Sequence, residues 1–310
     1  MFLTARQTSS ASRSSTGGSG RRHEATAGYL FVAPFLLVFT LFFVSPLLYA
    51  AYLSLFRHTI VGGDSFAGLA NFTRAIGDPN LQAGVVRMAE FFFVQVPFML
   101  VLSLLAALAI DSALLRGARV FRIGIFIPYA VPAVVATLMW GYLYGPDFGP
   151  FAQLFNGIGL PAPDFLGPTT ALFSMANVVT WEYTGYNMII LYTTLRAIDR
   201  ELYEAAAIDG ATAWQTAWSI KIPMLRPALT LCLLFSVIGS FQLFAEPQLL
   251  SRLAPTVIDS AYTPNVYAYT LAFTSQSVNY AAAVSFLVGI VIVIASYSVL
   301  FVINRAGRQS

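Results

Sequence analysis

Residues 204–223 read EAAAIDGATAWQTAWSIKIP, a polar segment between two long apolar stretches. Upstream of it, Asp199 can cap a short helix that runs to about Ile208. Gly210 then supplies a C-terminal stop, because glycine tolerates a left-handed backbone. The three alanines after Glu204 leave a smooth ridge that fits deep into a partner's groove, and the glutamate adds one charge to orient it.

The second half of this segment has its own start signal. Thr212 and Gln215 have the spacing of a capping box, which predicts that a second short helix begins there. Pro223 and Pro227 are expected to break the run before the next apolar stretch. The segment is therefore predicted to be a helix–turn–helix on a membrane surface.

The composition places the rest of the chain in lipid. Of 310 residues, 57% are hydrophobic and 10% are charged, and the mean hydropathy is +0.71. An ordinary soluble domain has about 25% charged residues, and a membrane-spanning helix needs about 20 apolar ones. No alternation of the β-barrel type is present. The prediction is an all-α polytopic membrane protein with six transmembrane helices, at residues 28–56, 88–110, 121–144, 170–195, 228–250 and 280–304.

The domain plan follows from these spans. Residues 1–27 are rich in Ser, Gly, Arg and Thr and are predicted to be a disordered tail before an uncleaved first helix. Residues 28–305 form the membrane domain, with the polar segment in a connection at about 196–227, and residues 306–310 form a C-terminal tail. The single cysteine, Cys232, excludes a disulfide framework or a cysteine metal cluster within one chain.

Lysine and arginine set the predicted orientation. Thirteen of the 17 basic residues fall in the two tails, the second connection and the 196–227 connection. The other side of the membrane has four, namely Arg57, Arg74, Arg87 and Arg252. Both termini and the polar segment are therefore expected in the cytoplasm, and the net charge of +3 reflects this bias and not nucleic-acid binding.

The polar segment resembles the EAA loop of ABC-importer permeases, whose pattern is E-A-A, three residues, G, nine residues, then I-x-L-P. The residues on the pattern are Glu204, Ala205, Ala206, Gly210, Ile220 and Pro223, while Ile222 stands where leucine is usual. With Asp209 they form the predicted ATPase-coupling set. Further motifs extend the resemblance over about residues 28–305 and make it closest to the maltose, glycerol-phosphate and oligosaccharide class: Phe66-Ala67-Gly68-Leu69-Ala70-Asn71-Phe72, Pro34, Pro46 and Ile127-Pro128.

The resemblance implies a bacterial plasma-membrane importer with several partners. These are a second, different six-helix permease, a cytoplasmic ATPase dimer and an extracytoplasmic solute-binding protein or lipoprotein that delivers a carbohydrate or related polyol. The EAA loop would dock into the ATPase. ATP and magnesium would be bound by that ATPase, so no cofactor is expected in this chain.

Polar residues within the spans before and after the EAA loop mark a candidate solute path. Glu182 lies 14 residues before Arg196, about 21 Å from the cytoplasmic edge. A carboxylate that deep costs roughly 2.5–3.5 kcal/mol, so it needs a partner or water. The resemblance also places solute contacts on these helices, and the predicted path is Glu182, Tyr183, Tyr186, Ser236, Gly239, Ser240, Gln242 and Leu243.

The same polar residues are also compatible with a purely structural role. Interhelical hydrogen bonds and an aromatic belt at the membrane interface would account for them as well. Glu182 stands where maltose-type members have an apolar residue, so the identity of the sugar does not transfer. Gln95 and Pro97 are interpreted as marking a helix kink.

The sequence offers no catalytic or metal site. Its only lysine, Lys221, lies outside any G-x-x-x-x-G-K-[ST] loop, and His23 and His58 fall on opposite sides of the membrane. We therefore predict a permease subunit that is not an enzyme. Two alternatives are an ion-coupled secondary transporter that uses Glu182 and a non-transporting membrane scaffold.

Overall fold

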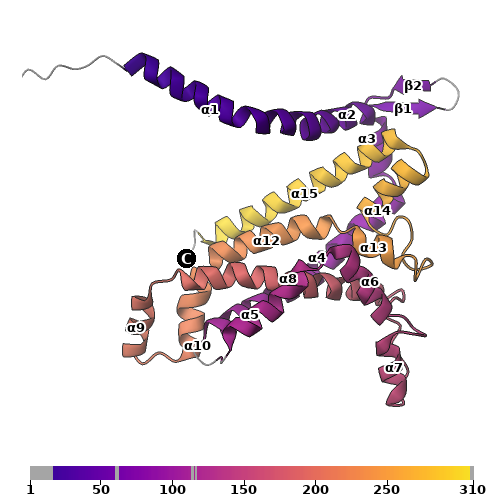
Figure 1. Cartoon of the computed structure of the whole chain (residues 1–310). Coiled ribbons are helices and arrows are strands. Elements are labelled where there is room, and N and C mark those ends of the chain that lie inside the picture. The colour runs from indigo at the N-terminus through magenta and orange to yellow at the C-terminus, as the bar shows by residue number, and fades with distance from the viewer. Residues whose placement is uncertain (1–16, 60–62, 113–114, 116, 308–310) are drawn as a thin grey trace, which may run out of the picture. The chain divides into compact units, whose positions relative to one another are not determined.

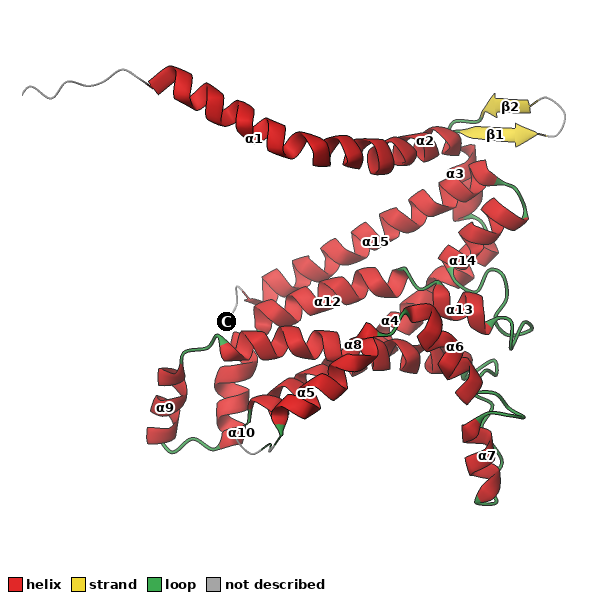
Figure 2. Ribbon diagram, viewed as in Figure 1, coloured by secondary structure: helices red, strands yellow, loops and turns green. Residues whose placement is uncertain are grey.

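The computed structural model describes residues 17–59, 63–112, 115 and 117–307. Helices dominate the described residues, and one short hairpin supplies the strands (Figures 1 and 2). The chain divides into two units, residues 1–52 and residues 53–310.

The first unit is a helix that continues just beyond its boundary. It consists of α1 (Gly17–Phe39), a π turn η1 (Thr40–Val44) and α2 (Ser45–Ser54). The π turn precedes Pro46, whose ring excludes the ordinary helical hydrogen bond four residues back. Residues 17–27, predicted to be disordered, are helical, because they continue the apolar helix; residues 1–16 of the predicted tail lie outside the described residues.

The second unit begins with a hairpin and a short helix. Strands β1 (Phe56–Thr59) and β2 (Gly63–Phe66) pair antiparallel. They are followed by α3 (Ala70–Ile76). The amide of Asn71 donates to the carbonyls of Ser54 and Phe56 at 2.9 and 2.8 Å, which ties α3 to the start of the hairpin.

Two long helices form the centre of this unit. Helix α4 (Pro79–Asp111) is longer than the predicted span at 88–110, because Asp78 caps it by accepting a hydrogen bond from Asn80 N–H. Helix α8 (Ala171–Arg196) packs along α4. The hydroxyl of Ser103 donates to Thr184 O at 3.0 Å, and a buried apolar cluster fills the interface on one side of this bond, with Ala107, Ile110, Met188, Leu191 and Leu195 among its members.

The predicted third span, 121–144, is wrong as a single helix. It consists of α5 (Ala118–Phe126), the 3-10 turn η2 (Ile127–Ala130) and α6 (Ala133–Leu143), and the two parts meet at 97°. Prolines 128 and 132 flank the break and remove backbone donors there. At 1.5 Å per residue the parts are about 20 and 16 Å long, so neither crosses a core of about 30 Å alone. Helix α7 (Pro150–Gly157) lies in the following connection.

The polar segment folds as the predicted helix–turn–helix. Helix α9 (Arg200–Ile208) is followed by Gly210 at φ +76° and by α10 (Ala213–Thr216), which begins with the predicted capping box. The helical run breaks at Leu225, between Pro223 and Pro227, as predicted. A π turn η3 (Ala217–Lys221) accommodates Pro223 within α11 (Ile222–Met224), and the chain turns at Leu225.

The last third of the chain contains the broken fifth span and the sixth. Helix α12 (Arg226–Phe241) stops at residues 242–244, and α13 (Ala245–Leu250) continues the span. Helix α14 (Pro264–Tyr269), the π turn η4 (Thr270–Thr274) and α15 (Val278–Gly307) complete the unit. Thr263 Oγ1 donates to Leu243 O at 3.1 Å and Asn265 Nδ2 to Phe241 O at 2.7 Å, so side chains satisfy carbonyls that the break exposes.

Four helices in the described residues are long and apolar enough to cross a membrane, and the bent pair α5–α6 can make a fifth. Those four cover Gly28–Ser54, Pro79–Asp111, Arg226–Leu250 and Val278–Phe301. Helix α8 has 26 residues, or about 39 Å, which is also long enough. Its mean hydropathy is lower than that of the four helices because it contains buried polar side chains, Glu182 and Asn187 among them.

Candidate functional site

A cavity of about 460 Å³ lies where α4, η2, α8, α12 and the break after α12 meet. This volume is within the range of small-molecule sites. Its lining combines aromatic rings with amides, hydroxyls and one carboxylate. The lining residues are Gln95, Met99, Tyr129, Ala133, Val179, Tyr183, Tyr186, Asn187, Phe235, Ser236, Gly239, Ser240, Gln242, Leu243, Phe244, Ala245 and Glu246.

Seven of the eight residues of the predicted solute path line this cavity. Tyr183 and Tyr186 come from α8, and the other five come from α12 and its break. Glu182 is not among the lining residues. It is 4% exposed and shares a face of α8 with the buried Val178 and Gly185, so it points into the helix packing.

Three tyrosines form an aromatic platform on one side of the cavity. The ring of Tyr129 stacks on Tyr186 at a centroid distance of 4.8 Å and meets Tyr183 edge-on at 5.7 Å. Gly185 allows this arrangement, because a Cβ built there would lie 2.1 Å from Ile125 O. The backbone of α5 therefore approaches α8 closely at this glycine and brings Tyr129 over the neighbouring ring. Tyr129 was not predicted from the sequence, because it lies inside an apolar stretch with no polar signal of its own.

The amide groups of two side chains in the cavity wall both lie near one methionine sulfur. Gln95 Nε2 donates to Met99 Sδ at 3.2 Å, and Asn187 Nδ2 lies 3.6 Å from the same sulfur and 3.1 Å from Tyr183 O. Gln95 lies inside α4, which continues through Pro97 as one helix, and its side chain is buried at the cavity; the kink expected at Gln95 and Pro97 stays a prediction. These bonds use amide donors, so the amide oxygens are the groups left to accept from a solute.

On the α12 side, hydroxyl groups face a gap in the packing. Ser236 Oγ donates to Cys232 O and Ser240 Oγ to Ser236 O, both at 2.8 Å, which leaves the lone pairs of each hydroxyl available. A Cβ built on Gly239 meets no atom within 4 Å. The cavity wall is therefore open at Gly239, and a larger side chain there would enter the cavity.

Two carboxylates lie at or behind the wall. Glu246 lines the cavity and is 6% exposed, and its negative charge lies close enough to repel that of Glu182. Among the described residues, none donates a hydrogen bond to Glu182 Oε2. A buried carboxylate oxygen without a donor is costly, so Glu182 is a destabilising group in the packing behind the cavity wall.

The predicted coupling residues lie together on the helix–turn–helix. Glu204, Ala205 and Ala206 are on α9, and Ala211 N–H donates to Ala206 O at 2.9 Å to close its C-terminus. Ile208 is 86% exposed at the end of this helix. A shallow hollow of about 280 Å³ adjoins it, lined by Asp209, Gly210, Ala211, Gln215, Thr216, Ser219 and Ile220. Pro223 follows in α11, outside the hollow.

Comparisons with known proteins agree with this geometry. Residues 99–306 match the family described as "binding-protein-dependent transport system inner membrane component". The lactose transport system permease protein LacF of Rhizobium radiobacter is 32% identical over 89% of this chain and 94% of its own length. The trehalose/maltose transport system permease protein MalF of Thermococcus litoralis is 31% identical over 71% of this chain and 75% of its own.

A third relative and a solved structure extend these matches. The sn-glycerol-3-phosphate transport system permease protein UgpA of Brucella abortus is 32% identical over 69% of this chain and 73% of its own. A crystal structure of a bacterial ABC transporter that imports the acidic polysaccharide alginate superposes with a TM-score of 0.81 at 19% identity. It covers 93% of this chain and 98% of its own, which supports the fold alone.

Proposed function

The chain belongs to the family of inner-membrane components of binding-protein-dependent transport systems, and on that basis we propose that it carries an uncharged carbohydrate through the cavity between α4, α8 and α12. Its fold is that of an ABC-importer permease, and it is a multi-pass inner-membrane protein. It is a permease subunit, which works with a solute-binding protein and a separate ATPase. Membership of this family decides against the ion-coupled secondary transporter and the scaffold.

The lining of the cavity supports a carbohydrate as the solute. Aromatic platforms stack on the apolar faces of sugar rings, and amide, hydroxyl and carboxylate oxygens accept from sugar hydroxyls. The Tyr129–Tyr183–Tyr186 platform and the oxygens of Gln95 and Glu246 supply both. Relatives named for lactose and for trehalose and maltose support the same class.

The charge of the lining supports an uncharged solute in particular. Of the described residues that line the cavity, none is Lys, Arg or His, while Glu246 is acidic and Glu182 lies close behind. A phosphate or uronate would enter this low-dielectric site without a cation to pair with, which is costly. We therefore expect neutral sugars to be carried in preference to phosphorylated or uronic ones.

Helix α9 and the cavity wall are the two parts of this chain that we expect partner subunits to contact. We propose that α9 docks into the ATPase with Glu204, Ala205 and Ala206 at the contact, and that ATP and magnesium are bound there. The split of basic residues favours both termini on that cytoplasmic side. Tyr183 and Gln242 are exposed on the cavity wall, which favours a second permease that closes the cavity, and we propose that this partner is a different six-helix subunit.

Uptake into proteoliposomes tests this function. The complete importer, reconstituted with its binding protein outside and ATP inside, should accumulate a neutral oligosaccharide and exclude its uronic counterpart. Accumulation should require ATP and survive an uncoupler that collapses ion gradients. Uptake that continues without ATP would refute the function, and preferential uptake of the anionic sugar would refute only the solute class.

A further inference from the structure

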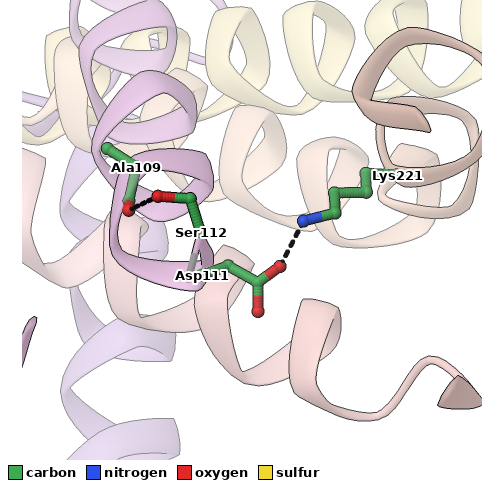
Figure 3. A network of polar contacts seen from close by, with 4 residues as sticks. All are labelled: Ala109, Asp111, Ser112 and Lys221. Carbon is green, nitrogen blue, oxygen red and sulfur yellow. Dashed lines mark hydrogen bonds and ion pairs between the residues drawn. The ribbon is translucent and has the colours of Figure 1, made fainter. Parts of the chain in front are cut away.

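A partly buried ion pair joins the coupling segment (residues 200–224) to α4, one of the helices that form the cavity. Lys221 Nζ lies 2.5 Å from Asp111 Oδ2, and the two side chains are 16% and 9% exposed (Figure 3). Lys221 is the last residue of η3, two residues before Pro223, and Asp111 is the last residue of α4. In the described part of the chain, this is the one hydrogen bond or ion pair between residues 200–224 and α4.

The local structure explains why these two groups meet. The π turn that accommodates Pro223 inserts one extra residue per turn and so sets the direction of Lys221. A carboxylate at the C-terminus of a helix is disfavoured by the helix dipole, and the ammonium of Lys221 offsets that repulsion at Asp111. Ser112 Oγ donates to Ala109 O at 2.7 Å beside the pair and satisfies one terminal carbonyl (Figure 3).

Lys221 also contacts the first helix of the coupling segment. Its ammonium lies 5.2 Å from the ring centroid of Tyr203 on α9, a cation–π distance. Burial raises the pKa of Tyr203, nearby Asp111 raises it further, and Arg196 opposes the shift. Tyr203 and Asp111 therefore lie close to the same ammonium, and Lys221 connects α9, η3 and α4 at one point.

We propose that the Lys221–Asp111 pair is a positioning pair, through which movement of the coupling segment moves α4 and with it the cavity wall. This inference rests on the proposed function, in which the ATPase moves α9. Met99, on the cavity wall, is 12 residues before Asp111 on the same helix, or about 18 Å along the axis. Because α4 is continuous and free of proline between them, a displacement at Asp111 is carried to Met99 as a rigid-body motion.

Variants that change the charge of Lys221 or Asp111 test this proposal in the complete importer. The variants are Lys221→Met, which keeps the length of the side chain, Asp111→Asn, the exchange Lys221→Asp with Asp111→Lys, and Lys221→Arg. Proteoliposomes with binding protein outside and ATP inside give solute uptake and ATP hydrolysis in one sample. The quantity compared is solute carried per ATP hydrolysed, together with the amount of assembled complex.

Lys221→Met and Asp111→Asn should assemble, hydrolyse ATP and carry about fivefold less solute per ATP, the lower end of typical coupling effects. The exchange and Lys221→Arg should restore the ratio, because each keeps opposite charges at the junction. An unchanged ratio in Lys221→Met would overturn the proposal, as would an assembled exchange variant whose ratio stays low. If the single variants fail to assemble, the solute carried per ATP in the exchange and Lys221→Arg variants is compared with wild type, and a low ratio in an assembled complex would overturn the proposal. A wild-type complex without ATP-dependent uptake would instead refute the proposed function.

Discussion

Truncation of Tyr129 is expected to weaken solute transfer through the loss of two ring contacts. The Tyr129 ring pairs with Tyr186 at 4.8 Å and with Tyr183 at 5.7 Å, and both partners line the cavity. An aromatic pair is worth about 0.5–1.5 kcal/mol beyond its buried area. Tyr129→Ala removes two pairs, about 1–3 kcal/mol, which corresponds to roughly 5- to 150-fold in an equilibrium constant.

The assay is the initial rate of ATP-driven uptake as a function of the concentration of loaded binding protein. Tyr129→Ala should lower the rate within that range, while Tyr129→Phe, which keeps both ring pairs, should stay within about threefold of wild type. Tyr297→Ala is the control, because Tyr297 is 70% exposed on α15 and does not line the cavity. A rate for Tyr129→Ala within twofold of the Tyr297→Ala rate would show that the platform does not contribute to transfer.

Three further predictions concern single positions. Gly185→Ala should lower the thermal midpoint and uptake, since its Cβ would lie 2.1 Å from Ile125 O and such overpacking costs about 1–3 kcal/mol, whereas Gly124→Ala, with open space around it, should lower neither. Burial acts to raise the pKa of Asp78, but hydrogen bonds from Tyr267 and Tyr280 outweigh it and hold the pKa below the unfolded value of about 3.9. The resulting stability is present above that value and is lost as the pH falls through the folded pKa, so Asp78→Asn should flatten the acid limb of a thermal-shift profile; an unchanged limb would contradict this. Glu182 faces the helix packing and none of the described residues donates to its Oε2, so Glu182→Gln should keep uptake within about threefold of wild type, and a larger loss would show that the carboxylate takes part in transfer.

The coupling segment could be predicted in detail because its signals are local. A capping box, a glycine that adopts φ +76° and a helix that ends near Ile208 all depend on residues within a few positions of one another. The π turn before Pro223 was not predictable in the same way. Whether a proline ends a helix or is absorbed by a π turn depends on what packs beyond it, and here Lys221 is held at Asp111.

The break in the third span shows the limit of hydropathy. An apolar run reports that a segment prefers lipid or a core, and it does not report the direction of the chain. Prolines are no guide by themselves, because Pro97 lies inside the unbroken α4 while Pro128 and Pro132 flank a 97° bend. Tyr129 lies in that bend, so its place on the cavity wall depends on the close approach at Gly185, which only the three-dimensional structure reveals.

Most of the cavity lining could be predicted from the polar residues within the spans, since the burial of a polar group has to be compensated by a site or a partner. The same rule placed Glu182 on the cavity wall, where the structure does not show it. Helical neighbours one position apart differ by about 100° in direction, so Tyr183 faces the cavity and Glu182 faces the packing.

Uptake by a variant that fills the cavity tests most directly whether solute passes through it. Gly239 opens on the cavity and Gly289 lies on α15 away from it, and a Cβ built at either glycine meets no atom within 4 Å. Gly239→Trp and Gly289→Trp therefore make the same addition in open space, one inside the cavity and one outside it. With equal amounts of assembled importer, Gly239→Trp should lose at least about tenfold in ATP-driven uptake, or about 1.4 kcal/mol, and Gly289→Trp should keep the wild-type rate. Equal uptake by the two variants would mean that the solute does not pass through this cavity.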